Sequence, residues 1–338
     1  MRLVTTALAI ALAGFGFVTG VQAQQITGAG ATFPAPIYTK WGEMAKSAIG
    51  VELNYQAIGS GGGQNQILNR TVDFGASDAP MDPAKLQSGN LLQFPTVMGA
   101  VVVIVNIPDV QVNQLKLTGP VLADIFLGKI TKWNDPAITG LNPGVKLPRL
   151  DIASVHRADG SGTTFVWASY LSAVSPEWKD KIGAATSVNW PTGAGAKGND
   201  GVAGTVNNTR GGIGYVEYSY ASQNKLVTAS LQNKDGKFVV PSMQAFGDAA
   251  AHADWAHAQN YAVDLINQPG PTAWPIMSTT FIELPKDPKD ATRSNNVMKF
   301  FDFAYSKGDE AAVGLEYVPL PQSVKDSVRQ AWKSQVHS

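Results

Sequence analysis

The stretch His156-Arg-Ala-Asp-Gly-Ser-Gly-Thr-Thr-Phe165 places two glycines and three hydroxyl side chains between two apolar segments. The apolar run from Ile152 to Val155 precedes it, and an apolar-periodic run through Phe165, Trp167 and Leu171 follows it. This order predicts a strand, a tight turn and the start of a helix. A strand that feeds directly into a helix is typical of an α/β fold.

A helix start of this composition suits a small anion. Unpaired backbone N–H groups and the positive end of the helix dipole lie at such a turn, and glycines allow a ligand to come close. The hydroxyls add hydrogen-bond donors, and Arg157 adds a fixed positive charge whose fork geometry matches an oxyanion. The stretch therefore predicts an oxyanion site, although Ser, Thr and Gly are also the residues of an ordinary helix cap.

The first 23 residues have the pattern of a secretory signal peptide. Arg2 is followed by an apolar run from Leu3 to Val21, and the small residue Ala23 follows that run. We expect cleavage after Ala23 and export of the mature chain. The sequence contains no Cys, which excludes a lipid-modified cysteine anchor, disulfides and thiolate metal sites and favours the bacterial periplasm.

Size and charge limit the classes of protein to consider. The chain has 26 Lys+Arg and 26 Asp+Glu, and removal of Arg2 with the signal peptide leaves 25 against 26. This balance offers no electrostatic surface for nucleic acid or an anionic membrane, so we expect neither as a partner. The hydrophobic content of 44% excludes a disordered chain, and about 315 mature residues (338 minus 23) predict two lobes.

The N-terminal part repeats the same strand-turn-helix order. A helical ladder from Ile37 to Ile49 ends at Gly50, and Thr32 is its predicted N-cap. A strand from Val51 to Ala57 leads into the turn Gly59-Ser-Gly-Gly-Gly63 and a further helix. Because ligands of open α/β sheets gather at the carboxyl ends of strands, we expect these turns to lie near one site.

Two apolar strands divide the chain. The strand Val97 to Val105 is long enough to leave one lobe and reach another, and the strand Ser278 to Leu284 is its predicted return. We therefore expect residues 24–105 and 277–338 to form lobe I and residues 106–276 to form lobe II. Further expected elements are a helix from Val121 to Leu127, a strand from Ile213 to Tyr218, and two C-terminal amphipathic helices, one through Val297, Phe301 and Ala304 and one through Val324, Val328, Ala331 and Trp332.

Several catalytic and cofactor motifs are excluded by their context. The pattern G-x-G-x-x-G at Gly193 to Gly198 follows Trp190-Pro-Thr192 rather than a strand, so it does not predict a dinucleotide site. Neither Ser60 nor Ser161 fits the hydrolase nucleophile elbow G-x-S-x-G, because Ile58 and Asp159 occupy the position of the first glycine. The four histidines lack metal-ligand spacing, and the tryptophans Trp133, Trp167, Trp178 and Trp190 are interpreted as packing residues.

Asp78 is unusual beside a predicted anion site. An ionised carboxylate only accepts hydrogen bonds, so it repels an anion that carries no proton. Phosphate keeps at least one proton near neutral pH and sulfate keeps none. An acceptor in a site otherwise made of donors would therefore select a protonated oxyanion. The alternative is that Asp78 only shapes the turn before Ala79-Pro80.

Four stretches of the sequence resemble the periplasmic phosphate-binding proteins of bacterial high-affinity phosphate ABC importers. They are Thr27-Gly-Ala-Gly-Ala-Thr-Phe-Pro-Ala-Pro36, Val72-Asp-Phe-Gly-Ala-Ser-Asp-Ala-Pro80, Arg157-Ala-Asp-Gly-Ser-Gly-Thr163 and Gly214-Tyr-Val-Glu-Tyr218. The resemblance implies a type II periplasmic binding protein fold. In that fold each lobe is a central sheet flanked by helices, two crossing strands form a hinge, and phosphate is held in the interlobe cleft.

The resemblance also implies roles for individual residues. The phosphate-binding residues would be Thr32, Phe33, Ser60, Asp78, Arg157, Ser161, Gly162 and Thr163, where Phe33 and Gly162 act through backbone N–H groups and Asp78 accepts the phosphate proton. Asp159 would pair with Arg157 and hold its fork. The run Gly61-Gly62-Gly63 departs from the pattern, in which some members are expected to have a second serine after Ser60.

The resulting expectation is an exported solute-binding protein that captures inorganic phosphate and delivers it to a membrane-embedded ABC permease. It would be a monomer without enzymatic activity, cofactor or metal. Alternatives are a binding protein for sulfate or molybdate, a secreted phosphatase that uses the same donors, and a surface adhesion or signalling protein that retains the fold.

Overall fold

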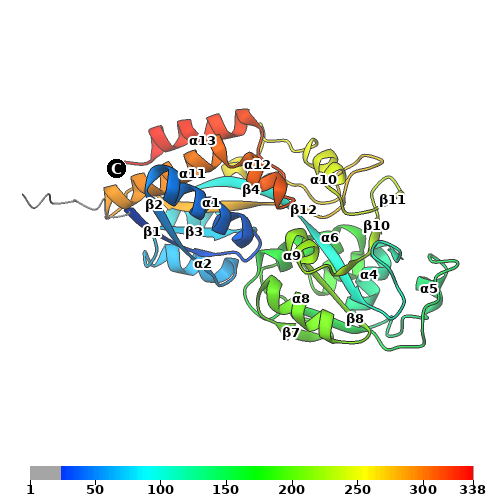
Figure 1. Ribbon diagram of the computed structural model, residues 1–338. Helices are drawn as coiled ribbons and strands as arrows, with labels where there is room; N and C mark the ends of the chain where they lie inside the picture. The colour runs from blue at the N-terminus through cyan, green and yellow to red at the C-terminus, as the bar shows by residue number, and fades with distance from the viewer. Residues whose placement is uncertain (1–23, 338) are drawn as a thin grey trace, which may run out of the picture.

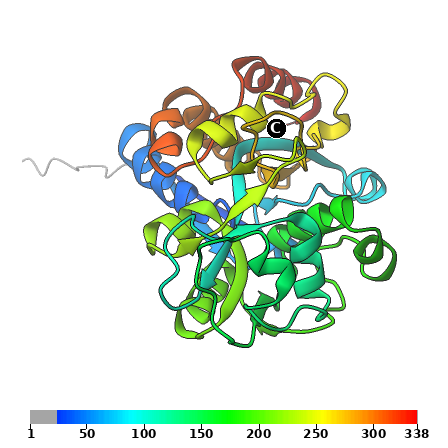
Figure 2. The same cartoon turned by 90° about the vertical axis from the view of Figure 1, so that its right-hand side faces the viewer.

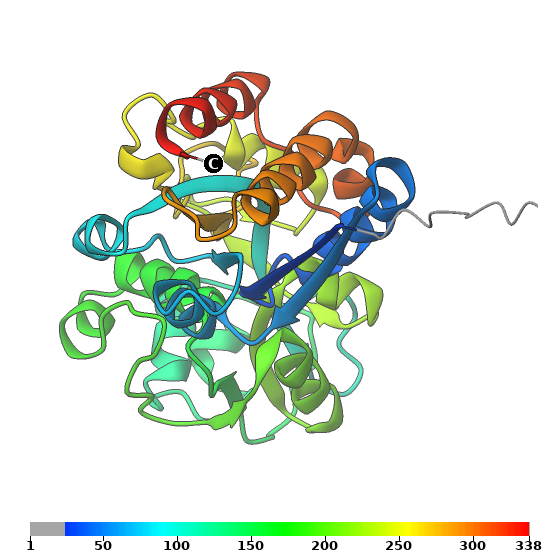
Figure 3. The same cartoon turned by 90° about the vertical axis from the view of Figure 1, so that its left-hand side faces the viewer.

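The computed structural model describes residues 24–337 and folds them into two lobes, one above the other in Figure 1. Figures 2 and 3 show the same division from two opposite sides. The two ends of the described chain share one lobe, here the first lobe, and most of the middle third forms the second lobe. The predicted signal peptide, residues 1–23, lies outside the described residues.

The first lobe combines strands and helices from both ends of the chain. Its elements are β1 (Gln24–Gly30), α1 (Ala35–Ile49), β2 (Val51–Ala57), α2 (Ser60–Leu68), β3 (Phe74–Ser77), α3 (Pro83–Ser88), β12 (Met277–Pro285), α11 (Ala291–Lys307), α12 (Asp309–Gly314) and α13 (Gln322–Gln335). Strand β4 (Leu91–Asn106) begins in this lobe and runs into the second.

The second lobe is built from the middle of the chain. Its elements are β5 (Lys116–Leu117), α4 (Gly119–Phe126), α5 (Pro136–Thr139), β6 (Ala153–Arg157), α6 (Gly162–Val174), α7 (Pro176–Lys181), β7 (Ala194–Ala196), α8 (Gly198–Asn208), β8 (Gly212–Glu217) and α9 (Tyr218–Gln223). The chain then returns through β9 (Val227–Thr228), β10 (Ser230–Gln232), β11 (Phe238–Val239), α10 (Met243–Ala250) and a 3₁₀ turn, Gln259–Tyr261.

One curled sheet connects the two lobes. Its strand order is β2-β1-β3-β12-β4-β8-β6-β7, and β9 also pairs with β4. Strand β4 pairs antiparallel with β12 over Leu91 to Ala100 and with β8 over Val101 to Asn106. A single strand therefore belongs to the sheets of both lobes, as Figure 1 shows for the long cyan strand.

The composition of β4 explains why it can be shared. Every residue from Leu91 to Val105 is buried, which is the continuous burial of a strand covered on both faces. Pro95 lacks an N–H, and the β12 register shifts between Thr280 and Phe281, opposite Thr96. This bulge accommodates the proline, since a proline cannot donate to the ladder.

Most of the predicted elements are confirmed. Helix α1 ends at Gly50, whose φ of 69° is left-handed, and β2 has the predicted bounds. Helix α6 begins at Gly162, and its N-cap is Ser161, whose Oγ accepts from the Thr164 N–H at 3.0 Å. The strand predicted from Val97 is longer and begins at Leu91.

Three local predictions are wrong in detail. Pro34, not Thr32, is the N-cap of α1, because the Thr32 hydroxyl accepts its hydrogen bonds from the second lobe instead. The glycine turn after β2 is the first turn of α2, which begins at Ser60. The strand predicted to reach Tyr218 ends at Glu217, because the Glu217 carboxylate caps α9.

The core consists mainly of apolar and aromatic side chains, as the composition indicates. Trp133, Trp167 and Trp178 are fully buried, in agreement with their interpretation as packing residues. Trp190 is half-buried and stacks on His156 with ring centroids 4.6 Å apart. No helix within residues 24–337 is long and apolar enough to cross a membrane.

We expect the shared strand to dominate stability. Ile104 is fully buried where β4 pairs with Gly214 of β8 and Thr228 of β9. Ile104→Ala should lower the free energy of unfolding by about 2–5 kcal/mol, since it removes buried methylenes and leaves a cavity. Val112→Ala, at a side chain that is 55% exposed, should change it by no more than about 0.5 kcal/mol. Urea denaturation measures both values, and equal losses would contradict the expectation.

Candidate functional site

The polar residues singled out in the sequence follow the carboxyl ends of four strands. Strands β2, β1 and β3 are parallel neighbours, so the segments that follow them leave the same edge of the sheet. Strand β6 ends at Arg157 and leads into α6 on the facing side, in the second lobe. All eight predicted contact residues are buried: Thr32, Phe33, Ser60, Asp78, Arg157, Ser161, Gly162 and Thr163.

Ser60 joins the two lobes. Its Oγ accepts hydrogen bonds from the Gly162 N–H at 3.0 Å and from the Asp78 N–H at 3.2 Å. Beside it, the Gly61 N–H donates to the Gly160 carbonyl at 2.9 Å. The starts of α2 and α6 therefore face each other across the interface between the lobes.

Gly162 is the position where this approach is closest. A Cβ built on Gly162 would lie 2.4 Å from Ser60 Oγ and 2.6 Å from Asp78 Oδ2. No side chain fits at such distances without displacing both groups. Only glycine allows the first turn of α6 to present its backbone against Ser60 and Asp78.

Asp78 is a buried carboxyl with few partners. Its Oδ1 accepts a 2.6 Å hydrogen bond from the Thr280 hydroxyl of β12. Burial raises the pKa of Asp78 to about 7, although Thr280, the charge of Arg157 and Ser60 each act to lower it. Near neutral pH this side chain is therefore poised between an acceptor and a donor.

Arg157 and Asp159 form the ion pair at the edge of the site. The guanidinium donates from Nε to Oδ1 at 2.8 Å and from Nη2 to Oδ2 at 2.5 Å. Burial raises the pKa of Asp159, but the hydrogen bonds and charge of Arg157 outweigh it and hold the pKa below its usual value. The Gly198 N–H at the start of α8 also donates to Asp159 Oδ1, at 3.1 Å.

Nη1 of Arg157 points to the site itself. It donates to Thr163 Oγ1 at 3.3 Å. The fork of Arg157 is therefore oriented by Asp159 on one side and directed at Thr163 on the other.

Three side chains from other parts of the chain donate hydrogen bonds to Thr32 and Phe33. Thr32 Oγ1 accepts from Asn199 Nδ2 at 2.8 Å, and the Thr32 carbonyl accepts from the Tyr220 hydroxyl at 2.6 Å. The Phe33 carbonyl accepts from the Tyr317 hydroxyl at 2.7 Å. Asn199 and Tyr220 belong to α8 and α9 of the second lobe, so they hold the Thr32 loop across the interface.

The hydroxyl oxygens of the site all accept hydrogen bonds from N–H groups. Thr32 Oγ1, Ser60 Oγ and Thr163 Oγ1 each accept two hydrogen bonds from N–H groups, and Ser161 Oγ accepts one. A hydroxyl has two acceptor positions and one proton. At Thr32 and Thr163 two N–H groups occupy the oxygen, so the O–H is what remains for a ligand and these two side chains serve as donors. Ser161 Oγ accepts only one N–H, and Ser60 Oγ keeps its second only while the Gly162 N–H faces it.

Two more carboxyl groups lie buried near the site. Burial raises the pKa of Glu217 to about 8, opposed by hydrogen bonds from Ser219 and Tyr317, and raises that of Glu283 to about 8, opposed by Gln64. The charge of Asp78 raises both values further. Glu217 Oε1 and Glu283 Oε2 have no hydrogen-bond partner among residues 24–337. Both acids therefore add little negative charge at neutral pH.

Sequence reasoning did not find every residue of this arrangement. It missed Thr280, Asn199 and Tyr220, which contact Asp78 and Thr32. A weak signal existed for Thr280, since Ser278-Thr279-Thr280 interrupts an apolar strand, and for Asn199, which follows the last glycine of the rejected G-x-G-x-x-G pattern. In the structure that pattern forms β7 and the start of α8.

These groups can bind a small oxyanion. The hydroxyls, the guanidinium and the N-terminal N–H groups of α2 and α6 lie around Asp78, a buried carboxyl group that can take a proton, while the Asp159 carboxylate is occupied by Arg157. No three His, Cys, Asp or Glu side chains within the described chain are grouped to hold a metal ion.

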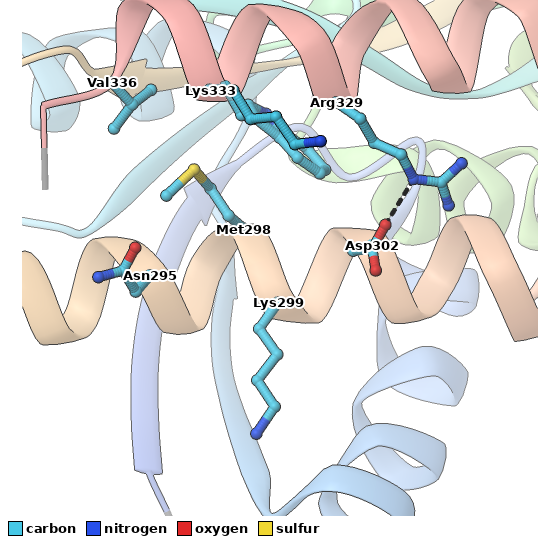
Figure 4. A pocket seen from close by; sticks show the side chains of 8 residues that line it. Asn295, Met298, Lys299, Asp302, Arg329, Lys333 and Val336 are labelled. Atoms are coloured by element: carbon cyan, nitrogen blue, oxygen red, sulfur yellow. Dashed lines mark hydrogen bonds and ion pairs between the residues drawn. The ribbon is translucent and has the colours of Figure 1, made fainter.

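Two other hollows differ from this site. A groove of about 360 Å³ reaches Asp78 from the side and is lined by α6, β12 and residues 262–266. A groove of about 550 Å³ lies on the surface between α11 and α13, where Arg329 is paired with Asp302 (Figure 4). None of the predicted site residues lines the second groove.

Comparison with known proteins agrees with the fold. Residues 18–307 match the family described as the PBP superfamily domain. The phosphate-binding protein PstS of Pasteurella multocida is 53% identical over 331 residues, which cover 98% of this chain and 96% of that protein. The phosphate-binding protein PstS of Haemophilus influenzae is 49% identical, covering 95% of this chain and 96% of that one.

Solved structures share the two-lobed fold at low sequence identity. A high-affinity periplasmic phosphate-binding protein with bound phosphate, PfluDING, has a TM-score of 0.73 and 22% identity, covering 91% of this chain and 94% of that one. A putative phosphate ABC transporter substrate-binding protein with bound phosphate from Clostridium perfringens has a TM-score of 0.65 and 16% identity, covering 88% and 100%.

The raised pKa of Asp78 has a consequence for stability without ligand. The folded chain holds this proton up to about pH 7, whereas the unfolded chain releases it near pH 3.8. The stabilisation is complete below about pH 4 and is lost as the pH rises to 7, by on the order of 4 kcal/mol. Asp78→Asn, which does not titrate, should show a smaller fall in the free energy of unfolding over this range.

Urea denaturation of both proteins from pH 4 to pH 8 measures the difference. Glu217 and Glu283 titrate in both proteins, and the main cause of their raised pKa values, burial, is unchanged, so most of their contribution cancels; loss of the Asp78 charge lowers both pKa values in the variant. Identical pH dependence in the two proteins would contradict the raised pKa of Asp78.

Proposed function

The chain belongs to the PstS family of phosphate-binding proteins, and we propose that it captures inorganic phosphate between its two lobes and delivers it to an ABC permease. The observation that supports this most is the combination of donor hydroxyls with Asp78, the buried carboxyl that is not paired with Arg157. That combination fits an oxyanion that brings a proton. Members of this family bind their ligand and are not enzymes.

The proposed phosphate contacts are the eight residues named from the sequence. The hydroxyls of Thr32, Ser60, Ser161 and Thr163 donate, as do the backbone N–H groups of Phe33 and Gly162 and the guanidinium of Arg157. Asp78 accepts the phosphate proton, and Asp159 orients Arg157. Their burial and mutual hydrogen bonds support these roles.

The proposed movement is closure of the lobes on phosphate. Residues 24–105 and 277–338 would form lobe I and residues 106–276 lobe II, with β4 and β12 as the hinge. Each lobe contributes only part of the contacts, so the ligand binds the closed arrangement better than an open one and shifts the population toward it. The shared pairing of β4 with β12 and β8 supports this hinge.

The proposed setting is the bacterial periplasm. Residues 1–23 would direct export and be cleaved after Ala23, and the mature protein would act as a monomer beside a membrane-embedded phosphate permease. The names of the relatives specify phosphate and give no support to sulfate, molybdate or a phosphatase activity.

Isothermal titration calorimetry tests the ligand directly. The ligand-stripped mature protein should bind phosphate with one-to-one stoichiometry and give no heat with sulfate at pH 8. Asp78→Asn should weaken phosphate binding about tenfold and narrow the preference over sulfate, because it removes the charge that accepts the proton. The matched variant Asp109→Asn, at an exposed turn residue, should leave both unchanged. Equal binding of sulfate and phosphate by the unaltered protein would refute the proposal.

The pKa of Asp78 makes the anion preference depend on pH. Protonated Asp78 donates a hydrogen bond, so it can accommodate an oxyanion without a proton. With a pKa of about 7, sulfate binding coupled to uptake of this proton should tighten about 30-fold between pH 8.5 and pH 5.5. Competition titrations measure this change, which should be absent in Asp78→Asn. A sulfate affinity independent of pH in the unaltered protein would show that Asp78 does not set the preference.

A further inference from the structure

Asn199 is the one side chain within residues 24–337 that donates hydrogen bonds to a predicted phosphate donor in each lobe. It is the second residue of α8 and is fully buried. Its Nδ2 donates to Thr32 Oγ1 at 2.8 Å and to Thr163 Oγ1 at 3.3 Å. Its own backbone N–H also donates to Thr32 Oγ1, at 3.3 Å.

The orientation of the Asn199 amide is determined by a third contact. Asn199 Oδ1 accepts from the Glu217 N–H at 2.9 Å. A backbone N–H can only donate, so the amide oxygen must face Glu217 and the amide nitrogen must face the threonines. Strand β8 thereby fixes which end of the amide points toward the site.

This orientation decides what the two threonines can do. Thr32 Oγ1 receives two N–H groups from Asn199, and Thr163 Oγ1 receives one from Asn199 and one from Arg157. Both acceptor positions of each hydroxyl are occupied, so each O–H is left to donate. Without the Asn199 amide, Thr32 keeps only the backbone N–H of residue 199 and Thr163 keeps only Arg157. One acceptor position of each hydroxyl is then free, so the hydroxyl could rotate and present its oxygen to the ligand, where it would repel an anion.

We propose that Asn199 is a positioning residue that holds the Thr32 and Thr163 hydroxyls as donors toward phosphate and couples that polarity to closure of the lobes. Asn199 and Thr163 belong to the second lobe, whereas Thr32 belongs to the first. Both acceptor positions of the Thr32 hydroxyl are therefore filled, and its O–H is left to donate, only when the two lobes are in contact. Asn199 itself does not contact phosphate. The inference rests on the proposed function, because it concerns the same site.

Double-mutant cycles on phosphate affinity test this role. Asn199→Ala should weaken phosphate binding about 10- to 100-fold, since two donors lose their orientation. The weakening should be several-fold smaller in a Thr32→Val background and in a Thr163→Val background, because the hydroxyl that Asn199 orients is already absent. Asn208→Ala, at an exposed position of the same helix, should leave affinity unchanged.

A purely structural role predicts a different result. Asn199→Ala also leaves the Glu217 N–H without its partner, so its stability is measured by thermal unfolding in the absence of phosphate. Asn199→Asp is a second variant, which keeps an acceptor for Glu217 but cannot donate to the threonines when ionised. It should bind phosphate at least as weakly as Asn199→Ala while its thermal stability is closer to that of the unaltered protein.

The outcomes separate this inference from the proposed function. If the unaltered protein does not bind phosphate, the proposed function fails. Suppose instead that it does bind phosphate. If Asn199→Ala then weakens phosphate affinity by the same factor with and without each threonine hydroxyl, the positioning role is wrong.

Discussion

Strand β4 is the constraint on which the rest of the structure depends. It is buried from Leu91 to Val105 and pairs with β12 on one side and β8 on the other, so neither lobe completes its sheet without it. The two partners then bring separate groups to one place. β12 brings Thr280 to Asp78, and β8 brings the Glu217 N–H to Asn199. A site between two lobes can be this ordered because both sides are registered on the same strand.

The second feature that defines the molecule is the direction of its hydrogen bonds. Helix starts and hydroxyl-rich turns are common, and on their own they indicate only caps. Here the N–H groups of one lobe meet the hydroxyl oxygens of the other, as Gly162 meets Ser60 and Asn199 meets Thr32. Each such contact occupies an acceptor position of the hydroxyl oxygen and leaves the O–H of that side chain available to donate. The closed interface therefore converts side chains that could bind many ligands into a set of donors suited to an anion.

Charge in the site is nearly balanced without a ligand. The positive charge of Arg157 is paired with Asp159, and burial raises the pKa values of Asp78, Glu217 and Glu283 to about 7 or 8. A site with little net charge depends on oriented dipoles and on proton content to distinguish one oxyanion from another. This explains why a carboxyl group can lie beside an anion site without opposing every anion.

The sequence by itself determined the α/β class and the strand-turn-helix junctions, and it indicated a candidate oxyanion site in the short contiguous motif from Arg157 to Thr163. These features follow from periodicity and turn chemistry, which are local. Asn199, Tyr220 and Thr280 could not be identified in this way, and Thr32 was wrongly expected to cap α1, because their partners are 167, 188 and 202 residues apart in the chain. Only the tertiary structure decided those pairings, since the curled sheet, and no local pattern, brings the two lobes together.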